Sequence, residues 1–103
     1  METSKVLMNI FGNMKGNFEK TLNLSEQELN SMHLVCTYSS GRIVFKAKQR
    51  IREENSTRTT SHSSDIAENF DGLLDMHAFV PGEVDISFEI CDVKDMKLVL
   101  TCK

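Results

Sequence analysis

The strictest pattern in the chain is the segment RIVFKAKQRIR, residues 42–52. Alternation with a period of two is typical of a strand with one face on a core and the other in water. An extended segment of this length would span roughly 36 Å, so we expect it to bend, bulge or extend past its partner. Its inward face would carry Ile43, Phe45, Ala47, Gln49 and Ile51, and its outward face Arg42, Val44, Lys46, Lys48, Arg50 and Arg52.

The five cations on the outward face of this segment admit two interpretations. They would form a row with a spacing of roughly 6.6 Å, twice the rise of a strand, and that row could meet an acidic partner or a line of phosphates. Alternatively, they protect an edge strand from pairing with another sheet, or they pair across the sheet with Asp85 and Glu89. The residues alone leave both interpretations open.

Charge is unevenly distributed along the chain, which has a net charge of −3. Five of the twelve basic residues lie in 42–52, where no acidic residue occurs, so the rest of the chain has seven basic residues against fifteen acidic ones. Domains that bind nucleic acids are usually basic overall. The sequence therefore predicts an acidic body with one basic strand, and nucleic-acid binding is the less favoured alternative.

Length and composition predict the class of protein. A chain of 103 residues fits a single domain, 1–103, and it contains no apolar run of about 18 residues that would cross a membrane. The first residues lack a basic segment followed by an apolar run, which predicts no secretory leader. The three cysteines, Cys36, Cys91 and Cys102, form no C-x-x-C pair. We expect three buried thiols in a reducing cytoplasm and no zinc site.

Two segments have apolar residues at helical spacing. The first, 4–20, has such residues at 6, 7, 10, 11, 14 and 18. The second begins after Ser64, has residues 66, 70, 73, 74 and 77 on one side, and ends before Pro81. Between them, LSEQEL at 24–29 has the capping-box pattern that starts a helix, which we expect to last about one turn.

The remaining segments predict strands and one loop. A strand beginning near Met32 and the basic strand would form a hairpin whose turn is residues 39–41. A second hairpin would join alternating runs at 84–90 and 96–102 through residues 92–95. Segment 53–64 is rich in Ser and Thr and predicts a mobile loop. The expected fold is therefore an α+β two-layer sandwich: an antiparallel sheet of about four strands in two hairpins, covered on one face by two helices.

Catalytic and metal motifs are not found in this sequence. It has no phosphate-binding loop, dinucleotide fingerprint or nucleophile elbow, so we expect no enzyme, no metal and no cofactor. A remote alternative is a small nuclease in which His62, with Arg58 beside it, works with His33 or His77. Catalysis needs these groups to converge, and nothing in the sequence indicates that they do.

A second candidate surface is acidic. On the predicted helix after Ser64, the spacing of three, three and four residues would bring four carboxylates close to one face: Asp65, Glu68, Asp71 and Asp75. An acidic ridge of this kind can dock on a basic partner or imitate a nucleic acid, although such a row is more often only solvated.

These features together favour a small non-enzymatic protein-binding module. We expect an inhibitor or immunity-type protein that docks by charge complementarity, through the basic strand or the acidic ridge, on a partner such as a toxin or a nucleic-acid-handling enzyme. Nucleic-acid binding through the basic strand 42–52 is the alternative, and a homodimer could form by strand pairing. No membrane partner is expected.

Overall fold

The computed structural model describes residues 5–103, which are almost entirely β-structure. Within that range there are six strands and one helical turn, so the expected α+β sandwich with two covering helices is wrong. The expectation of antiparallel pairing is confirmed, because every strand pairing is antiparallel. The elements are β1 (Lys5–Leu24), α1 (Glu26–Leu29), β2 (His33–Thr37), β3 (Ser40–Glu53), β4 (Ser56–Ile66), β5 (Asn69–Leu73) and β6 (Gly82–Cys102).

Strand β6 lies at the centre of a single sheet. On one side it pairs with β1 over its whole length, from Lys5 opposite Cys102 to Leu24 opposite Gly82. On its other side, the first half of β6 pairs with β3 and the second half pairs with β2. Outside these, β4 pairs with β3 and β5 pairs with β2. The free edges of the sheet are therefore β1 on one side and β4 with β5 on the other.

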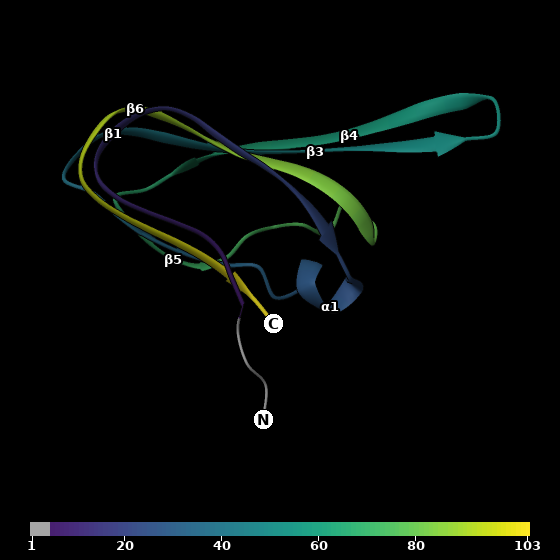
Figure 1. Ribbon diagram of the computed structural model, residues 1–103, viewed down its shortest axis with the longest axis horizontal. Coiled ribbons are helices and arrows are strands. Elements are labelled where there is room, and N and C mark those ends of the chain that lie inside the picture. Colours follow the sequence, from purple (N-terminus) through teal and green to yellow (C-terminus); the bar gives the residue numbers. More distant parts are fainter. Residues whose placement is uncertain (1–4) are drawn as a thin grey trace.

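The sheet curls into a half-barrel because its long strands bend at the same level (Figure 1). Strand β1 has register shifts between Gly12 and Gly16, where it faces residues 90–96 of β6. In β6 the bend contains two non-glycine residues with positive φ, Asp92 at 45° and Asp95 at 53°. The ammonium of Lys20 donates a hydrogen bond of 2.9 Å to the carbonyl oxygen of Leu7, thirteen residues earlier on the same strand. The two arms of the curl are thus joined across its opening.

Apolar side chains of both arms fill the inside of the curl. Phe45 of β3 and Phe88 of β6 are fully buried, and their ring centroids lie 5.2 Å apart. The inward residues of the second half of β6, such as Leu98 and Leu100, are also fully buried. The segment between β5 and β6 closes the core with the buried Phe79. The predicted inward faces of 42–52, 84–90 and 96–102 are therefore confirmed.

The expected helix at 4–20 is wrong: residues 5–20 belong to β1, and residue 4 lies outside the described residues. From Met8 onward the buried and half-buried apolar residues of β1 alternate as in a strand: Met8, Ile10, Met14, Phe18, Leu22 and Leu24. Several of them are four positions apart, a spacing that fits a helix as well as a strand, and the exposed Val6 and Phe11 complete the apparent helical stripe. Pairing with β6 along the whole strand determines the conformation.

The expected helix after Ser64 is also wrong. Its residues form the end of β4, strand β5 and the beginning of the segment that closes the core. Pairing with β2 determines this conformation, with Phe70 opposite Cys36 and the amide of Leu74 donating to the carbonyl of Met32 at 2.9 Å. Long-range sheet pairing has overridden the local helical pattern here.

The two expected hairpin turns are wrong, because neither segment reverses the direction of the chain. β2 and β3 both pair with β6, so residues 39–41 change the direction of the chain without reversing it. Residues 92–95 likewise lie within β6. Segment 53–64, expected to be a mobile loop, is mostly strand β4, which leaves only Glu54 and Asn55 between β3 and β4.

The short helical turn is confirmed with its capping box. The Ser25 hydroxyl accepts from the amide of Glu28 at 3.2 Å, and the Glu28 carboxylate accepts from the amide of Ser25 at 2.9 Å. Glu28 also accepts from the ammonium of Lys5 at 2.5 Å, which ties α1 to the beginning of β1. None of the helical structure in residues 5–103 is long and apolar enough to cross a bilayer.

Candidate functional site

The basic strand is confirmed, and its outer part projects beyond the body of the protein. β3 pairs with β6 only as far as Lys48, which lies opposite Asp85. From Gln49 to Glu53 its pairing partner is β4 alone. These five residues would extend the hairpin by about 17 Å. Figure 1 shows β3 and β4 reaching away from the curled body as a two-stranded ribbon. We call residues 49–60 the β3–β4 ribbon.

Two of the five cations on the outer face of β3 are neutralised within the protein. Arg42 forms an ion pair of 2.9 Å with Asp65 of β4, and Lys46 forms one of 2.7 Å with Glu89 of β6. The hydrogen bond from Lys46 lowers the pKa of Glu89. Both cations therefore have a partner within the sheet, and the pairing of Lys46 with Glu89 is the cross-strand contact that the sequence predicted.

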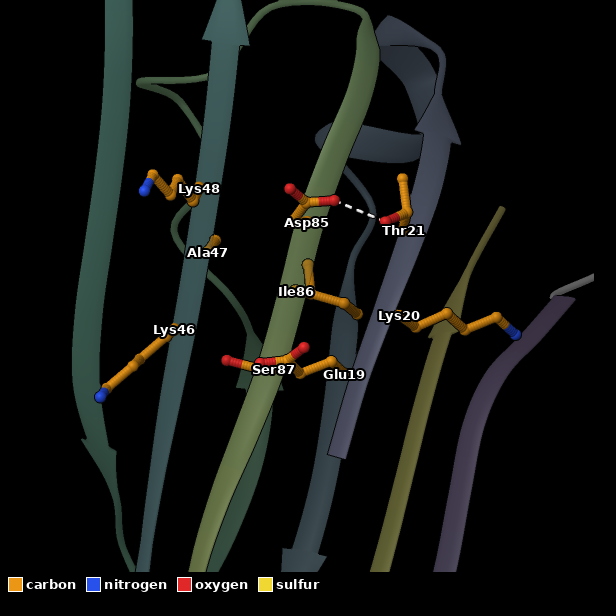
Figure 2. Close-up of a pocket in the computed structure, with 9 residues that line it drawn as sticks. All are labelled: Glu19, Lys20, Thr21, Lys46, Ala47, Lys48, Asp85, Ile86 and Ser87. Atoms are coloured by element: carbon orange, nitrogen blue, oxygen red, sulfur yellow. Dashed lines mark hydrogen bonds between the residues drawn. The ribbon is translucent and has the colours of Figure 1, made fainter. Parts of the chain in front are cut away.

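Asp85 does not neutralise the next cation. Its carboxylate accepts a hydrogen bond of 2.5 Å from the hydroxyl of Thr21 on β1 (Figure 2). Within residues 5–103, no carboxylate lies within ion-pair distance of Lys48, Arg50 or Arg52. All three side chains are exposed. The unneutralised positive charge of β3 is therefore concentrated where the strand leaves the body, and we call these three residues the cationic row.

The base of the ribbon is fixed by a buried polar side chain. Gln49 is only 3% exposed, and its Nε2 donates to the carbonyl oxygens of Val80 at 2.7 Å and Glu83 at 3.3 Å. Its Oε1 accepts from the amide of Val80 at 3.0 Å. Beyond this point Ile51 is only half-buried. The cationic row thus begins at a fixed base and continues onto a ribbon that the body no longer covers.

Two shallow hollows flank the Lys46–Lys48 part of the strand. The larger, about 420 Å³, lies toward β1 and is lined by both lysines and by Glu19, Thr21 and Asp85 (Figure 2). The smaller, about 290 Å³, lies toward β4 and is lined by the same lysines with Ser61, His62 and Ser63. In Figure 2 the side chain of Lys48 leans away from β6, toward β4. Its ammonium therefore stands over the smaller hollow.

The four carboxylates of the predicted acidic ridge do not share a face, because the helix that would align them is absent. Asp65 on β4 pairs with Arg42, and Glu68 lies between β4 and β5. Asp71 on β5 pairs with His33 of β2 at 2.5 Å. Asp75 lies after β5 and bonds His77, and this hydrogen bond lowers the pKa of Asp75. The four carboxylates are dispersed over four segments, and two of them, Asp65 and Asp71, are paired within the sheet.

The residues of the nuclease alternative show no catalytic arrangement. His62 lies on the inward face of β4, half-buried, with its ring centroid 6.5 Å from that of Phe45. Arg58 lies 3.7 Å from Glu53 on the ribbon, and His33 is held by Asp71 on the opposite arm. In the part of the chain that the structure describes, no hydrogen bond joins His62 to another titratable side chain, and no cluster of His, Cys, Asp and Glu could hold a metal ion.

The three cysteines are free, but they are not equivalent. Cys36 and Cys102 are buried as expected, and burial raises the pKa of both thiols, that of Cys36 to about 11. Cys91 is exposed at the bend of β6, so the expectation of three buried thiols is wrong for this residue. The alternation of the preceding run already predicts this exposure, because Ile90 faces inward and the next residue, Cys91, therefore faces outward.

Sequence reasoning missed the importance of Gln49 and of the edge of β4. Gln49 was placed on the inward face, and a polar side chain on such a face needs buried hydrogen-bond partners. That signal was present, although the partners Val80 and Glu83 could not be named from it. The polar composition of β4 predicted a loop, because the inward side chains of this strand are mostly half-buried and need not be apolar.

Comparison with protein-family models, with curated proteins and with solved structures gives no significant match to this chain. Similarity therefore assigns neither a family nor an activity. The function has to be inferred from the geometry of the cationic row and its surroundings.

Proposed function

We propose that this protein is a non-enzymatic binding module that docks on an acidic surface of another protein through Lys48, Arg50 and Arg52. The observation that carries the proposal is that these three exposed cations lie in a line that runs from the body onto the projecting ribbon, without a carboxylate partner in residues 5–103. Arg42 and Lys46, by contrast, are paired with carboxylates of neighbouring strands.

Charge complementarity would contribute more to the rate and specificity of docking than to affinity. The body of the protein is acidic, so an approaching acidic partner is repelled by the body and attracted by the ribbon, which orients the encounter. Exposed ion pairs are worth about 0.2–1 kcal/mol each, so three of them would contribute about 0.6–3 kcal/mol, or roughly 3- to 150-fold in affinity.

An inhibitor or immunity-type role is the form of this proposal that the shape supports best. A narrow ribbon that projects about 17 Å can enter a concave site on a partner, where a flat sheet face could not. The cationic row lies along the outer face of the ribbon and Glu53 and Glu54 lie at its tip, so the acidic groups of the partner would line the wall of that site and not its floor. Imitation of nucleic acid by an acidic ridge does not support this role, because the four carboxylates do not form a ridge. A cytoplasmic location is supported by the three free thiols, which a reducing compartment maintains.

Nucleic-acid binding is the second candidate, and one observation favours it. The major groove of DNA admits a two-stranded β-ribbon, and the β3–β4 ribbon has that form. The tip of the ribbon argues against it, because Glu53 and Glu54 would approach the phosphates first. The dispersed acidic groups of the body would add to the repulsion. A protein partner is therefore the better proposal.

Affinity capture from native lysate, with and without nuclease, tests the proposal. Wild-type protein is compared with the triple variant Lys48→Ser/Arg50→Ser/Arg52→Ser, which we call the ribbon variant. The matched control, Lys15→Ser/Lys94→Ser/Lys97→Ser, makes the same change in net charge at exposed positions far from the ribbon. Circular dichroism first establishes that all three proteins are folded.

The expected result is a protein partner that survives nuclease treatment, is retained by the control and is lost from the ribbon variant. If the same partner binds wild type and ribbon variant equally well, the cationic row is not the docking surface. Recovery that disappears on nuclease treatment would replace this proposal with the nucleic-acid alternative.

A further inference from the structure

The two free edges of the sheet differ in how they are protected. Edge strands usually avoid pairing with other chains through bulges, proline or lysine. β1 has three register shifts along its pairing with β6, together with Gly12 and Gly16 at positive φ. β4 contains no proline and no lysine, and its eleven residues pair with β3 without a register shift. Its arginine and its aspartate are paired with residues of β3, Arg58 with Glu53 and Asp65 with Arg42. No strand of residues 5–103 lies beside its other edge. The edge of β4 is thus a regular template for another strand, without a bulge, proline or lysine.

The outward face of β4 beside this edge carries short hydroxyl side chains. Ser61 lies opposite Lys48, Thr59 opposite Arg50, and Thr57 opposite Arg52. The smaller hollow, about 290 Å³, lies above Ser61 and Ser63, and the side chain of Lys48 leans toward it (Figure 2). Long cationic side chains therefore stand behind a row of short ones. Nothing on β4 between Thr57 and Ser63 separates the cations from a strand placed at the free edge.

We propose that the partner adds an extended strand to the free edge of β4 and carries carboxylates at alternate positions on the side of the cationic row. This inference rests on the proposed function and specifies how the partner binds. Adjacent strands lie about 4.8 Å apart, so the added strand would lie about 10 Å from β3. Carboxylates and cations would meet above the hydroxyl groups of β4. Both rows repeat every two residues, so one pair can form at each repeat.

The backbone and the charges would have separate effects in this mode of binding. Hydrogen bonds to the edge of β4 would provide affinity without regard to sequence, and the cationic row would select a strand with the acidic pattern. Lys48, Arg50 and Arg52 all project on the same face of the sheet. They would therefore contact only those side chains of the added strand that lie on this face.

A second copy of the chain fits this edge less well than an acidic strand of another protein. Opposite the cationic row, a second β4 would present only serine and threonine on its outward face, apart from Asp65, which already pairs with Arg42. The charge complementarity therefore favours a different partner.

The test uses a synthetic probe, the acetylated and amidated decapeptide with five Thr-Glu repeats. One control peptide has the same composition with its glutamates in a single block. A second has N-methyl groups on two adjacent central residues, which blocks hydrogen bonding at both edges of the strand and keeps every charge. Affinities are measured by titration, and amide hydrogen exchange of the ¹⁵N-labelled full chain is followed by NMR with and without probe. The ribbon variant and the Lys15/Lys94/Lys97 control variant are measured in the same way.

The alternating probe is expected to bind at least tenfold more tightly than either control peptide and to slow amide exchange within Ser56–Ile66 at least tenfold. The ribbon variant should lose about tenfold in affinity, and the control variant should not. Equal binding of all three peptides with unchanged exchange in β4 would overturn strand addition and leave charge docking in place. If no acidic peptide binds, or if both triple variants lose equally, the proposed function fails as well. A dimer in sedimentation without probe, protected at β4, would assign this edge to a second copy and also overturn the inference.

Discussion

Gln49 and Val80 are joined by two reciprocal hydrogen bonds. The amide of Val80 donates to Oε1 of Gln49 at 3.0 Å, and Nε2 of Gln49 donates to the carbonyl oxygen of Val80 at 2.7 Å. The side-chain amide of Gln49 thus pairs with the backbone of Val80 in the way that the backbone of a neighbouring strand would. It attaches the segment between β5 and β6 to the point where the ribbon leaves the body.

Replacing Gln49 with leucine should therefore destabilise the protein. Val80 and Glu83 would lose their side-chain partners, and each group left unsatisfied costs about 1–3 kcal/mol. Urea denaturation should show a loss of about 2 kcal/mol or more in the free energy of unfolding, against less than about 0.5 kcal/mol for the control Gln27→Leu at an exposed position of α1. A Gln49→Leu protein as stable as wild type would mean that this attachment is not needed.

Gly41 should tolerate no side chain. Its φ is +103°, and a Cβ there would lie 2.6 Å from the carbonyl oxygen of Asp92 and 2.8 Å from that of Cys91. We expect Gly41→Ala to destabilise the protein by about 3 kcal/mol or more, because backbone strain and overpacking add. The comparison is Gly72→Ala on β5, where the nearest atom would be 3.9 Å away. Thermal and urea unfolding of the two variants distinguish a steric requirement from a general intolerance of glycine replacement.

Stability should depend on Glu28 in a defined range of acidic pH. The hydrogen bond from Lys5, followed by those from Ser25, lowers the pKa of Glu28 from 4.5 to about 2. A pKa that is lower in the folded state stabilises the protein above the unfolded value, and this stabilisation is lost as pH falls through the folded value. The difference in free energy of unfolding between wild type and Glu28→Gln should therefore be constant above about pH 4.5 and shrink between pH 4.5 and 2.

The contribution of Lys5 to this pH dependence can be separated. Repeating the comparison in a Lys5→Met background removes the largest cause of the shift and should narrow the pH range over which the difference shrinks. An unchanged profile in that background would show that capping by Ser25 alone lowers the pKa of Glu28.

Thiol labelling should distinguish the three cysteines. Cys91 is exposed, whereas burial raises the pKa of Cys36 to about 11 and also raises that of Cys102. At pH 8 a maleimide should modify one thiol of the native protein rapidly and the other two only as the protein unfolds. Mass spectrometry should place the first modification on Cys91, and Cys91→Ser should abolish the rapid phase. Rapid modification of Cys36 would contradict the burial described here.

The sequence predicted well those features that depend on residues close to one another in the chain. The strand at 42–52 was recognisable because its inward residues, including Phe45 and Ala47, are buried without interruption by a bulge. The capping box at Ser25 was recognisable because its two hydrogen bonds join residues three positions apart. Neither inference needed knowledge of the rest of the fold.

Periodicity failed in the two long strands. In β1 the inward residues Ile10, Met14 and Phe18 are four positions apart, and the exposed Phe11 adds an interval of three, so the run also fits a helix. In β6 the inward residues Ile90, Val93 and Met96 are three positions apart around the bend, which resembled a turn between two strands. Only long-range pairing, which a local pattern does not contain, distinguishes these cases.

The candidate site was predictable in part. The placement of five cations on one face follows from alternation alone. Which of them are neutralised depends on Asp65 and Glu89, residues of two other strands, and the sequence anticipated only the second of these pairs. β4 itself was missed because its serines and threonines suggested a loop, although β-branched threonine is favourable in strands.

The central position of β6 determines the order in which this protein can acquire its structure during synthesis. β1, β2 and β3 are made first, yet each of them has β6 as a neighbour in the finished sheet. Until residues 82–102 have emerged from the ribosome, the apolar faces of the earlier strands have no surface to cover them. Sheets built from such distant pairings form slowly, and their unpaired strands are prone to aggregate meanwhile. The strands made first are therefore exposed to aggregation until the strand that joins them has been translated.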